Sequence, residues 1–510
     1  MDAQRKSATT IGSDFFESAH VRAFAESPFA AFLACLCFIG VLRLAALNLN
    51  GTDLYMDEAQ YWVWSRDIAL GYFSKPPLIA WLIHGTTAIC GDSEFCIRLP
   101  SVLLHLATSC LVYGLAARLY SHRVGIWSGL AFALLPGVSL SSGIITTDVP
   151  LLTAWALALF ATAGLVEKPT ARDAILLSLA LGAGLNAKYA MAYFFVCAAV
   201  FFVLAPDVRR RLLPHPFLWL AVGGGLLLIA PNLVWNLSNG FATLNHTVDN
   251  ANWHGAAFHP LKMLEFLVAQ FGVFGPILFG ALLVITLRTV RARKPLRTQD
   301  AFLIAFSLPI LLIVAGQALM SRAHANWAAP AYVGAVVLVT ATMVRDGAWG
   351  WMRASFGVNA AAALLLGVAV WQAGNFAIPG VGDPFLRTLG NRSLGEAVLG
   401  EIARAAGDGK PVAAILTDER ETAAALAYYA RRARLPILQW QTGKTPRNAF
   451  QMMFPFSPDG PYPVLFASQR PSSPVPQHFA ISHNAVRTVA AGRHGSRVFQ
   501  VSIFERMKKR

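Results

Sequence analysis

Long apolar runs, separated by short basic loops, limit what this chain can fold into more than any other feature of its sequence. About eleven runs approach the roughly 20 apolar residues that a helix needs to cross a bilayer. They cover about 28–47, 99–119, 124–142, 149–166, 174–187, 189–205, 217–235, 263–287, 301–319, 328–344 and 354–373. Only 14% of the residues are charged, against roughly 25% in soluble domains. The sequence therefore predicts an α-helical polytopic membrane protein, although the short fifth run could belong with its neighbour.

The basic residues indicate how these helices are oriented. The net charge is +15, but the lysines and arginines form no single stripe of the kind that binds nucleic acid. They cluster in alternate loops, as cytoplasmic residues do under the positive-inside rule: Arg123, Lys168, Arg172, Arg209–Arg211, Arg288, Arg291, Arg293, Lys294, Arg297, Arg345 and Arg353. We expect a multi-pass protein of the bacterial inner membrane that does not bind nucleic acid, with a cytoplasmic N-terminus and an uncleaved first anchor.

The last quarter of the chain has a different pattern. Residues 374–510 contain no run long enough to span a bilayer. Three short β-like stretches, PVAAILT, YPVLFAS and RVFQVSIF, accompany the helical pattern ERETAAALAYYARRA, which is typical of a small α/β unit. After an odd number of spans this unit lies outside. The sequence thus predicts a transmembrane domain at 1–373 and a periplasmic C-terminal α/β domain at 374–510.

The first external loop, residues 48–98, contains charged groups that need an explanation because charge near a membrane is costly. Asp57 and Glu58 are adjacent carboxylates, and Lys75 precedes a double proline. On spacing alone, a helix-capping acid and a snorkelling lysine explain these residues as well as a catalytic site does. Within the loop, two amphipathic helices are expected to lie along the membrane interface, at 58–70 and 76–90.

Two of the six cysteines stand outside the apolar runs. Cys90 and Cys96 flank the turn GDSEF, and a disulfide between them is permitted if this turn is periplasmic. The sequence leaves both the disulfide and the free thiols open. The remaining cysteines are expected to be small buried hydrophobic residues: Cys35, Cys37, Cys110 and Cys197.

Several segments resemble one superfamily of membrane enzymes. Their motifs are similar to those of the GT-C glycosyltransferases. The similar segments are MDEAQYWVWS, GYFSKPPLIAWL, GDSEFCIRLPSVL and TTDVPLLTAWALALF, and more weakly SRAHANWAAPAY. This fold group includes protein O-mannosyltransferases and bacterial transferases of aminoarabinose or galacturonic acid to lipid A or lipopolysaccharide core. The resemblance covers most of 50–165, with scattered support to about 335. It implies a GT-C-like fold and transfer of a sugar from a polyprenyl-phosphate donor.

The resemblance also assigns roles to three acidic residues. Asp57 matches the catalytic acidic position of the superfamily and is the candidate base, because an acceptor hydroxyl needs one as it attacks the anomeric carbon. Glu58 would position the acceptor or repel a misplaced phosphate. Asp148 matches a second acidic position, and capping a helix before Val-Pro is compatible with a role in the site. If the acceptor were itself a phosphate, Asp57 would orient it more than deprotonate it.

A leaving phosphate gathers negative charge and needs fixed cations. Lys75 matches the lysine of a KPPL-like motif in the superfamily and is expected to bind the donor phosphate, with Arg322 as the second cation. Some relatives carry Lys and Tyr where this chain has Arg322 and Asn326-Trp327, which weakens the assignment in that loop. Further candidates for substrate contact are Tyr61, Tyr72, His254, His324 and Asn326.

No cofactor is predicted, and a divalent metal stays open without support from the sequence. The external segment 236–262 contains His246, Asp249, His254 and His259, but their spacing matches no compact metal-ligand motif. The segment is expected instead to line the entrance for donor or acceptor. No Gly-rich phosphate loop is present, as suits a lipid-linked donor.

The expected partners are a polyprenyl-phosphate-linked sugar, a lipid A or lipopolysaccharide core acceptor, and membrane lipids. A uronic acid or an aminosugar is favoured as the donor sugar, because Lys75 and Arg322 could serve both a phosphate and a sugar carboxylate. A neutral hexose, or a protein acceptor as in O-mannosylation, stays open. Two alternatives from other classes are a lipid-carrier transporter or flippase and a structural assembly protein. The acids lie at external helix ends and not near the midplane, which disfavours a transporter.

Overall fold

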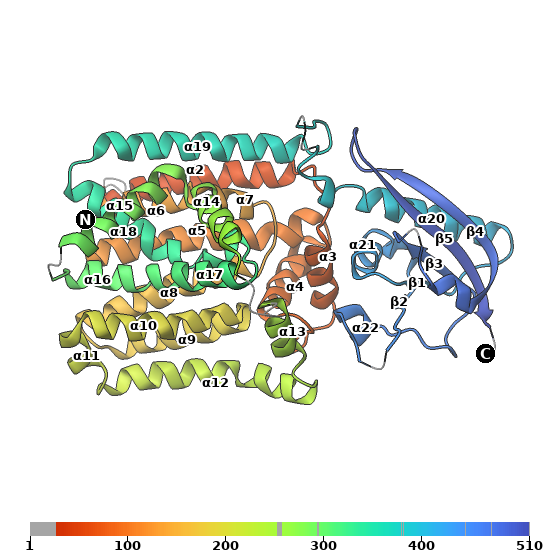
Figure 1. Ribbon diagram of the computed structural model, residues 1–510, viewed down its shortest axis with the longest axis horizontal. Coiled ribbons are helices and arrows are strands. Elements are labelled where there is room, and N and C mark those ends of the chain that lie inside the picture. The colour runs from red at the N-terminus through yellow and green to blue at the C-terminus, as the bar shows by residue number, and fades with distance from the viewer. Residues whose placement is uncertain are drawn as a thin grey trace, which may run out of the picture.

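The computed structural model describes residues 27–251, 258–292, 295–378, 380, 382–443, 445–470 and 472–508. Figure 1 shows a bundle of long helices on one side, a twisted sheet on the other, and the short helices α3, α4 and α13 between them. The helices up to residue 371 are α2 Pro28–Asn48, α3 Met56–Ser65, α4 Leu78–Cys90, α5 Glu94–Leu119, α6 His122–Ala133, α7 Pro136–Ser141, α8 Asp148–Glu167, α9 Ala171–Ala187, α10 Tyr193–Leu204, α11 Pro206–Leu212, α12 Pro216–Ser238, α13 Ala242–Ala251, α14 Pro260–Phe274, α15 Pro276–Ala292, α16 Thr298–Ala305, α17 Leu308–Met320, α18 Ala331–Arg345 and α19 Trp349–Trp371.

Within the described ranges, six helical segments are long and apolar enough to cross a membrane, or up to eight if two sharply bent pairs each count as one span. The six are α2, α5, α8, α12, the stretch Thr298–Met320 and α19. Every predicted run coincides with helix, so the prediction of a polytopic helical protein is confirmed at this level. The run predicted as a span at 263–287 is not one straight helix, because α14 and α15 meet at 118°. The break falls at Gly275, whose φ of 90° suits glycine and is followed by Pro276.

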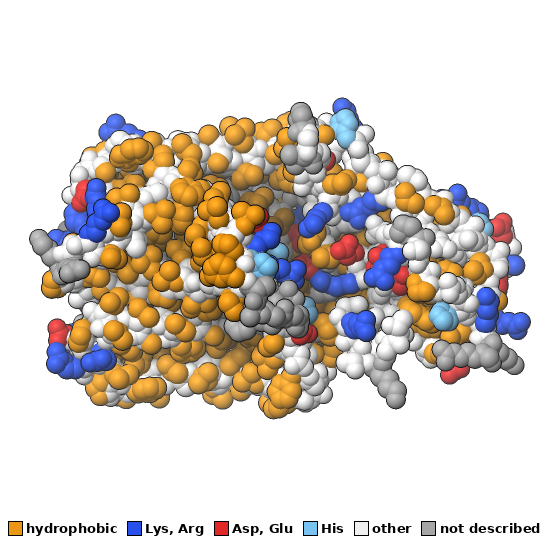
Figure 2. All heavy atoms as spheres, in the orientation of Figure 1, with side chains coloured by type: hydrophobic (Ala, Val, Ile, Leu, Met, Phe, Trp, Pro, Cys, Tyr) orange, Lys and Arg blue, Asp and Glu red, His pale blue; other side chains and the backbone are white. Residues whose placement is uncertain are grey.

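The bundle has an aromatic core and an aliphatic surface. Trp155 of α8 is fully buried and meets Phe194 and Phe306 edge-on, with ring centroids 5.3 and 6.3 Å apart. Outward-facing leucines, such as Leu227 of α12 and Leu364 of α19, are largely exposed. Hydrophobic side chains cover the visible face of the bundle in Figure 2. Such a broad apolar surface matches contact with lipid.

The C-terminal sheet is mixed, with strand order β2-β1-β3-β5-β4. Its strands are β1 Ala414–Thr417, β2 Ile437–Gln439, β3 Val464–Ser468, β4 Phe479–Ala490 and β5 Ser496–Met507. β1 pairs in parallel with β2 and β3, whereas β5 is antiparallel to β3 and β4. The three predicted stretches form β1, β3 and β5, while β2, β4 and the helix α20 Asn391–Gly407 escaped prediction. Apolar residues of α20 and of α21 Arg420–Tyr429 pack with the sheet in one core cluster.

Helix α21 also packs against α3 of the first loop, and this contact joins the first loop to the C-terminal part of the chain. The Tyr429 hydroxyl accepts a hydrogen bond from the backbone N–H of Leu54 (2.6 Å) and donates to Glu94 (3.0 Å). Tyr428 meets the ring of Trp62 edge-on, with centroids 5.0 Å apart. The contact places the first residue of α21 beside the first turn of α3.

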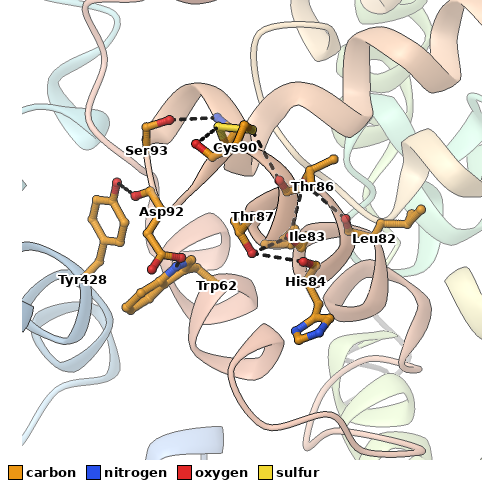
Figure 3. Close-up of a disulfide and its surroundings, with 11 residues drawn as sticks. Trp62, Leu82, Ile83, His84, Thr86, Thr87, Cys90, Asp92, Ser93 and Tyr428 are labelled. Carbon is orange, nitrogen blue, oxygen red and sulfur yellow. Dashed lines mark hydrogen bonds between the residues drawn. A yellow bond between two sulfur atoms is a disulfide. The ribbon is translucent and has the colours of Figure 1, made fainter.

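A disulfide joins Cys90, the last residue of α4, to Cys96 in the first turn of α5, with 5.9 Å between their Cα atoms. It closes the turn that contains Asp92 (Figure 3). The Asp92 carboxylate accepts a hydrogen bond from the Trp62 indole (2.9 Å), and its backbone oxygen accepts one from the Tyr428 hydroxyl (2.8 Å). The cross-linked turn therefore supports both α3 and α21.

Candidate active site

Charged side chains gather in a recess between the helical bundle and the sheet (Figure 2). Asp57 lies in the first turn of α3, where the helix dipole favours a carboxylate. Arg420 is the first residue of α21. Its guanidinium donates one hydrogen bond to the Asp57 carboxylate and a second, of 2.8 Å, to Oε1 of Gln60. The C-terminal part thus places a cation on the residue predicted to be the base.

A second carboxylate and cation pair stands at the start of α8. Asp148 is the first residue of that helix, and its Oδ1 lies 2.6 Å from Nζ of Lys188. Its other oxygen accepts a hydrogen bond of 2.7 Å from the Asn326 amide. Lys188 occupies the break between α9 and a short 3-10 turn at Tyr189–Ala192. Asn326, a predicted contact residue, therefore lies in this cluster.

Lys75 lies within electrostatic range of both pairs. Burial is the main cause that lowers the pKa of Lys75, followed by the nearby charge of Lys188, and Arg420 lowers it further. Asp57 and Asp148 act in the opposite direction. Among the residues that the structure describes, the Lys75 ammonium has no hydrogen-bond or ion-pair partner. It is a cation within electrostatic range of two carboxylates that are each paired with another side chain.

His246 of α13 joins the same cluster. Its ring meets Phe73 edge-on at a centroid distance of 5.8 Å. Burial, and then the charges of Lys75 and Arg420, lower its pKa to about 4. The imidazole is therefore neutral near pH 7 and can both donate and accept a hydrogen bond. No group of three or more His, Cys, Asp or Glu side chains within the described ranges could hold a metal ion.

Glu58 occupies a different environment from its neighbour. Its side chain is buried, and its two oxygens accept hydrogen bonds of 2.8 Å each from the equally buried Arg98. The backbone N–H groups of Tyr55 (2.9 Å) and Ile145 (3.0 Å) donate to the same carboxylate. Both carboxylate oxygens of Glu58 are thus occupied by hydrogen bonds within the protein. These contacts give Glu58 a structural role, because they tie the loop that precedes α3 to the loop that precedes α8, and its role toward the acceptor or phosphate stays a prediction.

The two predicted tyrosines also differ. The Tyr72 hydroxyl donates to the backbone oxygens of Trp64 (3.0 Å) and Asp67 (2.9 Å), and its ring stacks on Trp64. Tyr72 thus stabilises the first loop, and its contact with substrate stays a prediction. Tyr61 is buried near Asp57, and burial first and Asp57 second raise the pKa of its phenol well above 10. It stays a neutral side chain at the edge of the cluster.

The remaining predicted residues lie in or near the loop after α17. Arg322 is exposed there. Burial is the main cause that lowers the pKa of His324, and the charges of Arg322 and Lys188 add to it. Arg322 therefore lies on the Lys188 side of the cluster. His254 falls outside the described residues.

Three members of the cluster were not predicted as site residues. Lys188 could have been predicted from the sequence, because it is a charged residue between the apolar runs 174–187 and 189–205, where charge is costly. His246 was noticed only as a metal candidate. Arg420 had no local signal, since 363 residues separate it from Asp57.

Comparison with known proteins shows which family the chain resembles. The family described as dolichyl-phosphate-mannose-protein mannosyltransferase matches residues 74–235. The lipid A galacturonosyltransferase RgtD of Rhizobium johnstonii is 34% identical over 441 residues, which cover 86% of this chain and 91% of RgtD. The lipopolysaccharide core galacturonosyltransferase RgtA of the same organism is 31% identical over 250 residues, covering 47% of this chain and 50% of RgtA.

Among solved structures, ArnT from Cupriavidus metallidurans shares the fold. The apo form covers 93% of this chain and 98% of its own, with a TM-score of 0.66 and 15% sequence identity. The form bound to undecaprenyl phosphate gives a TM-score of 0.62 at 16% identity, and covers 93% and 97% of the two chains.

Fold and motifs together define a membrane glycosyltransferase of the GT-C class, so the resemblance inferred from the sequence is confirmed. The chain belongs to the family of the lipid A galacturonosyltransferase RgtD. It is an enzyme, and the expectations of a transporter or a structural assembly protein are not supported.

Proposed function

We propose that the enzyme transfers a galacturonic acid residue from a polyprenyl-phosphate donor to lipid A or to the lipopolysaccharide core. The names of RgtD and RgtA support the sugar and the acceptor. The undecaprenyl phosphate bound to ArnT supports the class of lipid carrier. The single observation that carries the proposal is the Lys75 ammonium, which lies within electrostatic range of Asp57 and Asp148 and has no ion-pair partner among the described residues.

At the donor end, the Lys75 ammonium binds the phosphate that leaves. Negative charge grows on this phosphate as its bond to the sugar lengthens, and a cation fixed in place stabilises that charge. Lys188 adds a second cation, which Asp148 and Asn326 hold in position. Arg322, exposed on the same side, is the third. Asp148 acts here through Lys188 and is a positioning residue.

At the acceptor end, Asp57 is the base. A hydroxyl oxygen of the acceptor forms a bond to the anomeric carbon while the bond from that carbon to the phosphate oxygen breaks. The hydroxyl proton passes to the Asp57 carboxylate, and the polyprenyl phosphate departs with the bonding electron pair. A neutral His246 nearby can accept or donate a hydrogen bond to the sugar hydroxyls without adding charge.

The orientation in the membrane follows from the distribution of charge. The site lies at the end of the bundle that carries the C-terminal sheet, whereas α11 with Arg209–Arg211 and the ends of α15 and α18 lie at the opposite end (Figure 1). Positive residues favour the cytoplasm. We infer eleven spans, with the site and a C-terminal domain at 374–510 in the periplasm of the inner membrane.

Mass spectrometry of lipid A and core oligosaccharide from cells with and without the gene tests this function. The expected result is the loss of one hexuronic acid residue from lipid A or core in the deletion strain. The wild-type gene should restore the residue, and the Asp57→Asn variant should not. Unchanged lipopolysaccharide would refute the proposal, and loss of a hexose from proteins would favour O-mannosylation instead.

A further inference from the structure

We propose that Arg420 recognises the carboxylate of the donor sugar, and that Asp57 occupies the place of this carboxylate as long as no donor is bound. The inference rests on the proposed function, because it concerns the same donor. It assigns the carboxylate to a residue of the C-terminal part, and not to Lys75 or Arg322. It also makes binding of the correct sugar the event that releases the base.

The first observation is the Asp57 and Arg420 pair itself. A guanidinium presents a planar fork of donors that matches a carboxylate, and such pairs are selective for planar acids. The exposed fractions of the two side chains are 38% for Asp57 and 28% for Arg420. The pair therefore lies open to the recess rather than sealed in the core. A carboxylate ligand can reach Arg420 without unfolding anything around it.

The contrast with the buried pair of Glu58 and Arg98 strengthens this point. Those side chains are 3% and 1% exposed, and further backbone groups occupy the carboxylate. Glu58 is therefore locked, whereas Asp57 accepts, among the described residues, only the hydrogen bond from Arg420. Of the two adjacent acids, only Asp57 can be exchanged for another carboxylate.

The second observation is the side chain of Gln60. Its Oε1 accepts a hydrogen bond from Arg420, and the side chain is almost fully buried at 1% exposure. Its Nε2 amide has no hydrogen-bond partner within the described part of the chain. A buried donor without an acceptor is costly, and in native proteins it calls for an explanation such as a missing ligand. A carboxylate bound at Arg420 would bring an acceptor to this amide.

The third observation is the charge of the cluster. Lys75, Lys188, Arg322 and Arg420 carry four positive charges against the two carboxylates of Asp57 and Asp148. A phosphodiester balances one of the two excess charges. A uronic acid donor brings one more carboxylate, which displaces the Asp57 carboxylate from the guanidinium of Arg420. A carboxylate that loses its cation accepts a proton more readily, so the exchange prepares Asp57 to deprotonate the acceptor. A neutral sugar leaves Asp57 held by Arg420.

The test compares two donors on the same polyprenyl phosphate carrier, one with galacturonic acid and one with galactose, which differ only at C6. The purified full-length enzyme is measured as wild type, Arg420→Gln and Arg431→Gln. Arg431 is the matched control, because it lies in the same contact with the first loop but bonds to the backbone oxygen of Tyr428 instead of Asp57. Equal melting temperatures of the two variants establish that both are folded.

We expect Arg420→Gln to lower kcat/KM for the galacturonosyl donor about a hundredfold, the usual scale for truncating a charged pair. The same change should leave the galactosyl donor within a few fold or make it better. Arg431→Gln should keep the wild-type preference. If Arg420→Gln lowered both donors equally, or kept the preference, the inference would be overturned. A wild-type enzyme that transferred neither sugar would instead overturn the proposed function.

Direct measurement of donor binding distinguishes competition between the two carboxylates from a structural role of Arg420. In the Asp57→Asn variant the carboxylate that competes for Arg420 is gone, so the galacturonosyl donor should bind several fold more tightly than to wild type. Adding Arg420→Gln to that variant should abolish the gain. Unchanged or weaker binding to Asp57→Asn would contradict the exchange, and the galactosyl donor serves as the control that should show no gain.

Discussion

The Nζ atom of Lys188 lies 2.6 Å from Oδ1 of Asp148, and the amide of Asn326 occupies the other oxygen of that carboxylate at 2.7 Å. The three residues come from the α9 break, the start of α8 and the loop after α17. A carboxylate engaged on both oxygens is better suited to orienting a lysine than to accepting a proton. Asp57, engaged by one half-buried arginine, is the freer acid.

We expect Asp148→Asn to act through Lys188. Without its ion pair the ammonium should drift from the phosphate, and displacement of about 1 Å can cost about a hundredfold in rate. Lys188→Met should show a similar loss of kcat/KM for the donor, and the double variant should lose little more than either alone. Lys168→Met at the opposite end of α8 is the control. Additive losses would show that the two side chains act independently.

The Asp57→Asn variant should remain folded in membranes and lose turnover by at least about a hundredfold, since general-base help is worth roughly that. The amide keeps the shape of the side chain but cannot take a proton at neutral pH. Single-turnover kinetics at saturating donor measure the chemical step apart from binding. Turnover equal to wild type would remove Asp57 from the mechanism.

Donor affinity should depend on alkaline pH through Lys75. Burial and neighbouring cations lower the pKa of Lys75 from its ordinary value of 10.5. The charged form exists below that pKa and is lost as pH rises through it, so affinity should fall with a midpoint below 10.5. Titrations of donor binding from neutral to alkaline pH measure this midpoint. Lys75→Arg should bind with a flatter profile, because a guanidinium stays charged; identical profiles would exclude Lys75 as the source.

The proposed topology predicts that a reporter enzyme fused after Arg510 is active only in the periplasm. A second fusion in the loop after α15, which carries basic residues, should be active only in the cytoplasm. Both fusions are compared at equal expression in intact cells. Cytoplasmic activity of the C-terminal fusion would overturn the eleven-span arrangement and the location of the site.

The sequence predicted the parts of the fold that depend on local pattern. Apolar runs predicted the helices, and short local motifs identified Asp57, Lys75 and Asp148 as candidate site residues. Sequence could not separate Asp57 from Glu58, since adjacent carboxylates look alike until burial and the distant Arg98 distinguish them. The bend at Gly275 was not predicted, because the composition of an apolar run does not show where a helix changes direction.

The arginine contributed by α21 escaped for a different reason. Its partners Asp57 and Gln60 precede it by about 360 residues, and only the tertiary packing of α21 on α3 brings them together. The pairing of the sheet strands β1 and β3 likewise depends on chain segments far apart in sequence. Local sequence patterns do not reveal such contacts between distant segments.

The packing of α21 on α3 has a consequence for how the protein is made. The first loop is synthesised early, but the side chains that complete its surroundings emerge only after the whole bundle has been translated. A nascent chain stopped at the end of α19 would already sit in the bilayer, with Asp57 lacking its arginine and Leu54 lacking the hydroxyl that holds it. The surroundings of Asp57 are therefore completed only when α21 has been made, and a chain that stops before α21 lacks the arginine that pairs with the proposed base.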